Sequence, residues 1–176
     1  MSDCYLNIKT IATDNIQLLR ELSQLMAQIS ADAFSANNET LQSGSIGAHV
    51  RHIIEHYSSL MMGVGSLTSD GLINYDNRPR NRELENSPTN AIQEIDQVCI
   101  QLENLTQELS LVVVCSTNTY SEPSAAKSSL SRELSFLHSH TTHHMAIIRL
   151  LTLHTGLAVS PEFGKAASTK KFEQNV

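Results

Sequence analysis

The stretch Leu130–Gly156, LSRELSFLHSHTTHHMAIIRLLTLHTG, contains two histidines within the apolar stripe of an expected helix. Positions three, four and seven apart share one face of a helix. Here that face carries Leu137, His140, His144, Ile147, Ile148 and Leu151. An apolar stripe faces the protein interior, so His140 and His144 are expected among core residues, with His143 toward the edge of the stripe. Their i, i+4 spacing can direct both imidazoles at one metal ion.

A second cluster, formed by His49, His52 and His56, lies in the helix expected to begin at the N-cap residue Ser45. With spacings i, i+3 and i+7, the three histidines form a stripe on the flank of the apolar face of this helix. A single histidine in either cluster is ordinarily a hydrogen-bonded core or surface residue. Two clusters on two helices favour a shared metal ion, because burying several imidazoles without partners costs free energy. Periodicity alone leaves open which of the three faces the other helix.

Four stretches with helical periodicity predict an all-α fold, a four-helix bundle formed as a single domain by residues 1–176. The expected helices follow the cap signal Thr13–Asp14, run from Ser45 toward Gly65, run from Ser87–Pro88 to about Leu109, and span Leu130–Gly156. The polar connection between the second and third helices, Ser66–Asn86, is a long crossover. Between the third and fourth helices, the β-branched run Leu111–Cys115 could form a short hairpin with residues near Ala126–Leu130.

The composition argues against several classes of partner. The net charge is −6, which argues against nucleic-acid binding, because phosphate contacts need a clustered basic surface. No apolar run approaches the roughly 20 residues needed to cross a bilayer, and the N-terminus lacks a signal-peptide pattern, so no membrane association is expected. The three cysteines include no CxxC pair and suit free thiols in a reducing compartment, so the cytoplasm is the expected location.

Several short motifs resemble the DinB/YfiT-like superfamily of metal-binding four-helix bundles. Ser45–Gly47 followed by His52–Ile54 resembles the opening of its metal-bearing helix. Arg132–Phe136 followed by His140–His144 resembles its HxxxH helix, and Phe163–Thr169 resembles a terminal segment of one subgroup. The resemblance covers most of the chain from Ser45 onward. It implies a bundle with one long crossover and, by family analogy, a homodimer.

The resemblance also implies one divalent metal ion held by three histidines, one from the second helix and two from the fourth. Carried over by position, the ligands are His52, His140 and His144, although His49 and His56 beside the first of them leave its identity open. Zinc or nickel is the expected ion, with iron or manganese as alternatives, because imidazole discriminates weakly among these metals.

The function that this resemblance implies is metal-dependent chemistry on a small-molecule substrate. Superfamily members include transferases that use low-molecular-weight thiols, and related bundles form one domain of sulfoxide synthases. The expected activity is therefore that of a thiol transferase or hydrolase, in which the ion activates a thiol or water against an electrophile. The competing interpretation is a non-catalytic metal-binding or stress-response bundle, in which His49 or His56 completes the coordination of the ion. No catalytic residue is assigned.

Further candidate residues flank the expected ligands and occupy the crossover. Three histidines are candidates for hydrogen bonds to the ligands or for a general base, and equally for ordinary hydrogen-bonding roles: His49, His56 and His143. The candidate substrate-binding residues of the crossover are Tyr75, Asp76, Arg78 and Arg80. An arginine fork suits a carboxylate or phosphate of a substrate. The favoured interpretation is that these arginines instead pair with acidic residues of the crossover and order it.

Overall fold

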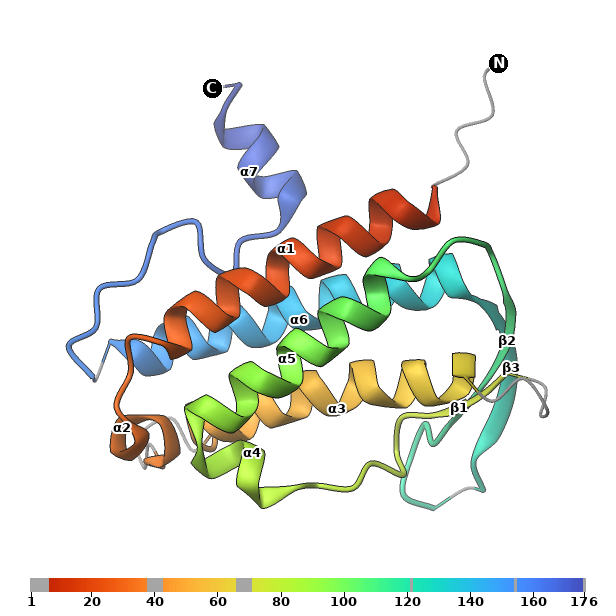
Figure 1. Cartoon of the computed structure of the whole chain (residues 1–176), viewed down its shortest axis with the longest axis horizontal. Coiled ribbons are helices and arrows are strands. Elements are labelled where there is room, and N and C mark those ends of the chain that lie inside the picture. Colours follow the sequence, from red (N-terminus) through yellow and green to blue (C-terminus); the bar gives the residue numbers. More distant parts are fainter. Residues whose placement is uncertain (1–6, 38–42, 66–70, 121, 154, 176) are drawn as a thin grey trace.

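The computed structural model describes residues 7–37, 43–65, 71–120, 122–153 and 155–175. Four long helices lie side by side in Figure 1: α1 (Ile8–Met26), α3 (Ile46–Gly65), α5 (Pro88–Glu103) and α6 (Leu130–Thr152). Because α1 and α3 each contact both α5 and α6, the four helices share one apolar core. The described residues also form three short helices, α2 (Ala31–Ser35), α4 (Arg82–Asn86) and α7 (Ala167–Glu173). No helix in these ranges is long and apolar enough to cross a membrane.

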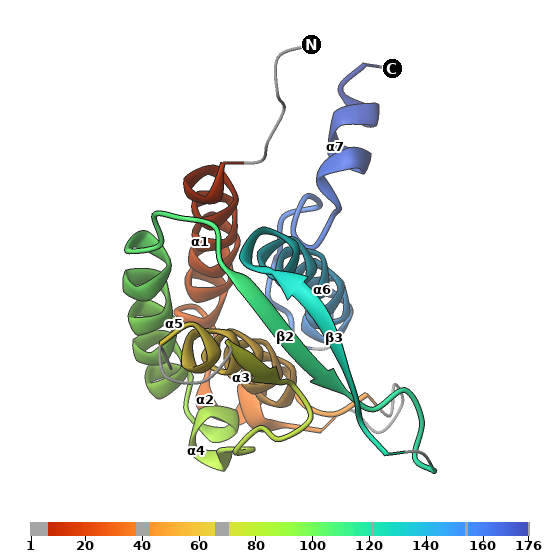
Figure 2. The same ribbon diagram turned by 90° about the vertical axis from the view of Figure 1, so that its right-hand side faces the viewer.

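A three-stranded sheet crosses one end of the long helices, as Figure 2 shows. The central strand, β2 (Ser110–Cys115), pairs antiparallel with β3 (Ser124–Ser129) and parallel with β1 (Leu72–Asn74). Parallel neighbours need a long connection between them, and α4 and α5 supply it here. β1 packs against α3, and β3 leads directly into α6. The sheet therefore joins the crossover to the helices that carry both histidine clusters.

The prediction of an all-α four-helix bundle is wrong, because the three-stranded mixed sheet makes this a mixed α/β fold. The expected hairpin is present as β2 and β3, but β1 was not expected in the crossover. β1 has three residues, too few for the alternation that reveals a strand, and only Ile73 among them is buried. Ile73 packs so closely on α3 that a Cβ on Gly63 would lie 2.6 Å from its Cγ1.

Serine and asparagine caps explain where the long helices begin. The Oγ atoms of Ser45, Ser87 and Ser129 accept backbone N–H groups in the first turns of α3, α5 and α6, at 3.0, 3.2 and 3.4 Å. α1 begins before the Thr13–Asp14 signal, because the Asn7 side chain caps it by accepting the N–H of Lys9 at 2.9 Å. These caps satisfy donors that a helix cannot satisfy itself.

A buried polar network joins α1, α3 and α6 inside the core. The Tyr57 hydroxyl donates to Oδ1 of Asn15 at 2.6 Å and accepts from the Thr141 hydroxyl at 3.2 Å. Asn15 Nδ2 donates to the backbone carbonyls of Ile11 at 2.8 Å and Leu134 at 3.2 Å. All three side chains are at most 1% exposed, so their hydrogen bonds form out of water. Burial raises the pKa of the Tyr57 hydroxyl, which therefore remains a donor.

We predict that Gly47→Ala destabilises the protein by about 3 kcal/mol, the upper part of the range for overpacked sites. A Cβ at Gly47 would lie 1.9 Å from the backbone oxygen of Glu85, so α4 would have to move away from α3. Urea denaturation measures the free energy of unfolding. The control is Gly65→Ala at the other end of α3, where a Cβ meets no described atom within 4 Å. Equal effects of the two substitutions would contradict the close approach.

We also predict that Tyr57→Phe lowers the free energy of unfolding by about 1–3 kcal/mol. The substitution leaves Asn15 Oδ1 without its donor and the Thr141 hydroxyl without its acceptor, both inside the core. Thermal and urea denaturation measure the loss. Tyr120→Phe is the matched control, because Tyr120 is 98% exposed and its loss of a hydroxyl should change stability by less than about 0.5 kcal/mol. A Tyr57→Phe protein as stable as the control would show that the network contributes nothing.

Candidate metal centre

The imidazoles of α3 and α6 meet in one cluster. His52 faces His140 with 3.0 Å between their Nε2 atoms. The His144 ring, one turn further along α6, has its centroid 4.5 Å from that of His52 and 4.6 Å from that of His140. One ring nitrogen from each of the three lies within 4.8 Å of the other two, so the group could hold a metal ion. Elsewhere in the described ranges no other such group of histidine, cysteine or acidic residues occurs.

His49 lies at one side of this cluster. Its Nδ1 atom is 2.9 Å from Nδ1 of His144, a distance at which one of the two donates to the other. The ring centroids are 5.1 Å apart and the rings are tilted by 42°. Nε2 of His49 is buried and has no hydrogen-bond partner among the described residues. His49 therefore either orients the His144 ring or adds a fourth nitrogen beside an ion.

His56 lies at the opposite side and is 5% exposed. Its Nδ1–H donates to the backbone carbonyl of His52 at 2.7 Å, so Nε2 is the nitrogen that carries the lone pair. The His56 ring stacks on Tyr75, with centroids 5.4 Å apart, and lies 4.4 Å from the His140 ring. His56 thus packs against two ligand candidates without joining the group of three. His143, by contrast, is exposed at the edge of α6.

Partial burial keeps the clustered imidazoles neutral. Loss of hydration, together with the smaller effects of the neighbouring His56 and His144, lowers the pKa of His52 to about 2. The same cause, followed by the proximity of His140, lowers the pKa of His144 to about 3. Burial also lowers the pKa values of His49, His56 and His140. At neutral pH these side chains are therefore uncharged, and a neutral imidazole is the form that binds a metal.

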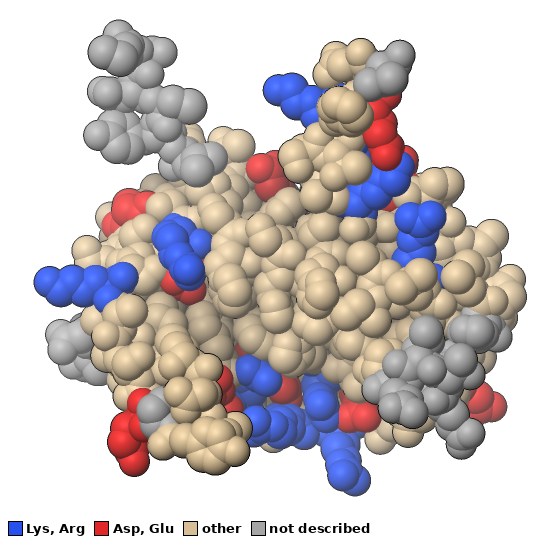
Figure 3. Space-filling view, turned by 180° about the vertical axis from the view of Figure 1, so that it is seen from behind, with Lys and Arg blue, Asp and Glu red and all other residues tan. Residues whose placement is uncertain are grey.

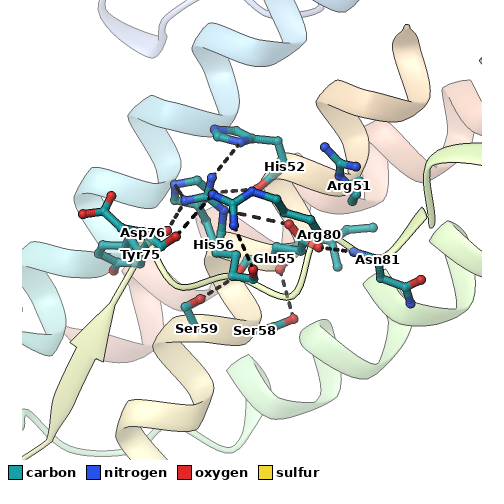
Figure 4. A network of polar contacts seen from close by, with 12 residues as sticks. Arg51, His52, Glu55, His56, Ser58, Ser59, Tyr75, Asp76, Arg80 and Asn81 are labelled. Atoms are coloured by element: carbon teal, nitrogen blue, oxygen red, sulfur yellow. Dashed lines mark hydrogen bonds and ion pairs between the residues drawn. The ribbon is translucent and has the colours of Figure 1, made fainter. Parts of the chain in front are cut away.

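The crossover places Arg78 against the cluster. Its Nη2 lies 3.5 Å from Nδ1 of His52, and its Nη1 lies 3.5 Å from Nε2 of His56. Nη1 also donates to the backbone carbonyl of Tyr75, and Nε lies 3.9 Å from Oε2 of Glu55. Figure 4 shows how this segment passes over the face of α3 that carries the two histidines. Burial lowers the pKa of the Arg78 guanidinium while Glu55 opposes the shift, and the group stays charged at neutral pH.

The other three crossover candidates make structural contacts. The Tyr75 hydroxyl donates to Oε2 of Glu133 at 2.9 Å, so its ring, rather than its hydroxyl, faces the histidines. The Asp76 carboxylate accepts the backbone N–H of Ser116 at 2.7 Å. Arg80 is exposed and donates to backbone carbonyls of its own loop at 3.3 and 3.4 Å. Of the four candidates, Arg78 is the one whose polar atoms reach the imidazoles.

Two buried carboxylates near the site were not singled out from the sequence. Glu55 is 3% exposed, and its Oε1 accepts the backbone N–H of Asn81 at 2.7 Å. Glu133 is fully buried and accepts from Tyr75, Ser128 and Arg132. Helical spacing could have identified Glu133, which lies on the same stripe as His140 and His144. An acidic residue in an apolar stripe needs hydrogen-bond donors, and here they come from the crossover, from β3 and from α6 itself.

The donor set and its spacing fit a divalent metal ion. With metal–nitrogen bonds of about 2.0–2.1 Å, two imidazole nitrogens on one ion lie roughly 3.0–3.4 Å apart, depending on the angle at the ion. The 3.0 Å between Nε2 of His52 and Nε2 of His140 meets this requirement. The neutral state of the rings meets the second requirement, a lone pair on each ligand.

Comparison with protein-family models, with curated proteins and with solved structures gives no match.

Proposed function

We propose that this protein is a metal-dependent enzyme of the DinB/YfiT-like type. In it, a divalent ion held by His52, His140 and His144 activates water or a low-molecular-weight thiol against a small-molecule electrophile. The observation that carries the proposal is the convergence of three neutral imidazole nitrogens within 4.8 Å. Zinc or nickel is the ion we favour, since both bind imidazole well and no sulfur or carboxylate ligand joins the group among the described residues.

The composition of the group favours catalysis over a purely structural role. Structural zinc sites are closed by four protein ligands, most often including cysteine, whereas catalytic sites have three protein ligands and an open position. When bound here, the ion would supply Lewis acidity that lowers the pKa of a water or thiol beside it. His52, His140 and His144 would orient the ion, and His56 and Tyr75 would shield one side of it from solvent.

The motif resemblance supports the same proposal independently of the distances. The residues that match the superfamily pattern by position are also the three that meet in space, although His49 and His56 are close by in the sequence. The long crossover that the resemblance implies lies against this cluster and carries Arg78.

We predict that His140→Ala lowers the metal content of the purified protein to below about a tenth of an equivalent, because two imidazoles bind a divalent ion much more weakly than three. Elemental analysis of protein purified without a nickel column measures the content. His143→Ala is the matched control, since it removes an exposed histidine from the same helix, and its metal content should equal that of the unsubstituted protein. Full occupancy in the His140→Ala protein would refute the site.

A second candidate function is a non-catalytic metal-binding bundle, and the position of His49 is the observation that favours it. Nδ1 of His49 lies 2.9 Å from Nδ1 of His144, just below the roughly 3.0–3.4 Å that separates two imidazole ligands of one ion. Four protein ligands would close the coordination sphere and leave no position for a substrate.

X-ray absorption spectroscopy of the zinc-loaded protein separates the two functions. We predict three imidazoles and one water or other exogenous ligand on the ion, and a His49→Ala protein that still binds about one equivalent of zinc. In the proposed enzyme His49 orients His144 and does not bind the ion, so its removal changes affinity by about 10–100-fold rather than abolishing binding. Four imidazoles in the unsubstituted protein and three in the variant would instead establish the non-catalytic function.

A further inference from the structure

The guanidinium of Arg78 is mostly buried yet only partly satisfied. Its side chain is 13% exposed. A guanidinium has five N–H donors, and here the Tyr75 carbonyl accepts from Nη1. Nε has no hydrogen-bond partner among the described residues, and its ion pair with Glu55 spans 3.9 Å. Among the described residues, Nη2 faces a ring nitrogen, Nδ1 of His52, at the long distance of 3.5 Å. A buried cation whose N–H groups lack hydrogen-bond acceptors is unfavourable, and an added acceptor would stabilise it.

Metal binding would change the contact between Arg78 and His52 from attractive to repulsive. Nε2 of His52 is the nitrogen that faces His140. A neutral imidazole that binds an ion through Nε2 carries its proton on Nδ1. Metal-bound histidines normally donate this proton to a carboxylate, a carbonyl or a water. Here the group beside Nδ1 is another donor, Nη2 of Arg78. With an ion bound, two N–H donors would therefore point into the same space.

A bound ion would also add positive charge beside the Arg78 guanidinium. The three ligands are neutral, so a divalent ion would keep its full charge close to a guanidinium. Glu55, the carboxylate beside Arg78, lies 3.9 Å from its Nε and so offsets part of the guanidinium charge but joins no ligand group among the described residues, and Asp76 accepts the backbone N–H of Ser116. In Figure 3, lysine and arginine side chains gather along the lower edge of the molecule, with aspartate and glutamate side chains among them, where Figure 1 draws the crossover. An added anion would relieve this repulsion.

We propose that Nη2 of Arg78 and Nδ1–H of His52 form an oxyanion subsite beside the metal, and that the substrate of this protein carries a carboxylate there. The inference rests on the proposed function, because Nδ1 becomes a donor through metal binding at Nε2. One carboxylate oxygen would accept from both donors, and the rest of the substrate would reach the ion past the edge of the His52 ring. Arginine suits this role because its guanidinium stays charged and Nη2 still offers N–H donors while Nη1 and Nε face other groups.

In the described part of the chain, the contacts of Arg78 that stabilise the fold involve Nη1 and Nε and do not involve Nη2. Nη1 and Nε face the Tyr75 carbonyl and Glu55, and these contacts hold the crossover on α3. Among the described residues, Nη2 instead faces Nδ1 of His52. A structural arginine would therefore affect stability and the binding of every ligand alike. An oxyanion subsite affects anionic ligands selectively.

The test compares two thiols of similar size on the cobalt-loaded protein, mercaptoacetate with a carboxylate and 2-mercaptoethanol with a neutral hydroxyl. Cobalt content is measured first by elemental analysis, and thiol binding is then followed by the visible absorption of the ion. We expect the unsubstituted protein to bind mercaptoacetate at least about tenfold more tightly than 2-mercaptoethanol, the preference that one charge-assisted hydrogen bond supplies. Arg78→Gln should abolish this preference while its affinity for 2-mercaptoethanol stays within about twofold.

Two further variants keep the test decisive. Arg78→Lys retains the charge without the fork and should keep part of the preference, which covers the case in which Arg78→Gln does not fold. Arg82→Gln removes an exposed charge from the same segment and should leave the preference intact. The subsite alone would be overturned if the cobalt-loaded Arg78 variants kept the full preference for mercaptoacetate. It would also be overturned if the cobalt-loaded unsubstituted protein showed no such preference. An unsubstituted protein that takes up no cobalt would overturn the proposed function, and the subsite with it.

Discussion

The register between α3 and α6 is the constraint on which the candidate site depends. Thr141 of α6 donates to Tyr57 of α3 inside the core. Thr141 is one residue from His140, and Tyr57 is five residues from His52. A slip of one helical turn moves a side chain by about 5.4 Å along the axis. The candidate ligand nitrogens lie within 4.8 Å of one another, so such a slip would separate them. Because Tyr57 also donates to Asn15 of α1, a third helix helps to hold the register.

A cluster of partly buried imidazoles disfavours added protons. The low pKa values of His52 and His144 show that the surroundings disfavour protons there, because each added positive charge loses hydration and meets its neighbours. A divalent ion differs from protons, since one ion uses three lone pairs at once and its bonds replace the lost hydration. The imidazoles are therefore uncharged at neutral pH, with one ring nitrogen of each of His52, His140 and His144 within 4.8 Å of the other two.

Much of the site could be predicted from the sequence, and less of the fold. The clusters around His52 and His140 have helical spacing, a local property that a single sequence displays. Periodicity could not identify which histidine of α3 meets His140 and His144. His49, His52 and His56 lie on one stripe, and packing decides which of them faces α6. β1 was missed because its pairing with β2 is non-local and its three residues have no readable period. Glu133 lies on the stripe of His140 and His144, but the burial of its carboxylate depends in part on Tyr75, a non-local donor from the crossover that periodicity does not reveal.

The sheet that makes this fold more than a helical bundle also organises the crossover over the site. β1 is fixed by pairing with β2 and by packing of Ile73 on α3. Beyond β1, the crossover is held at successive points, at Tyr75 by Glu133 and at Asn81 by Glu55. Arg78 lies between these two points, so its position against the imidazoles follows from the anchors on either side rather than from its own contacts alone. A loop without the strand would have to order this arginine at a greater cost in conformational entropy. The short strand thus connects the fold to the chemistry of the site.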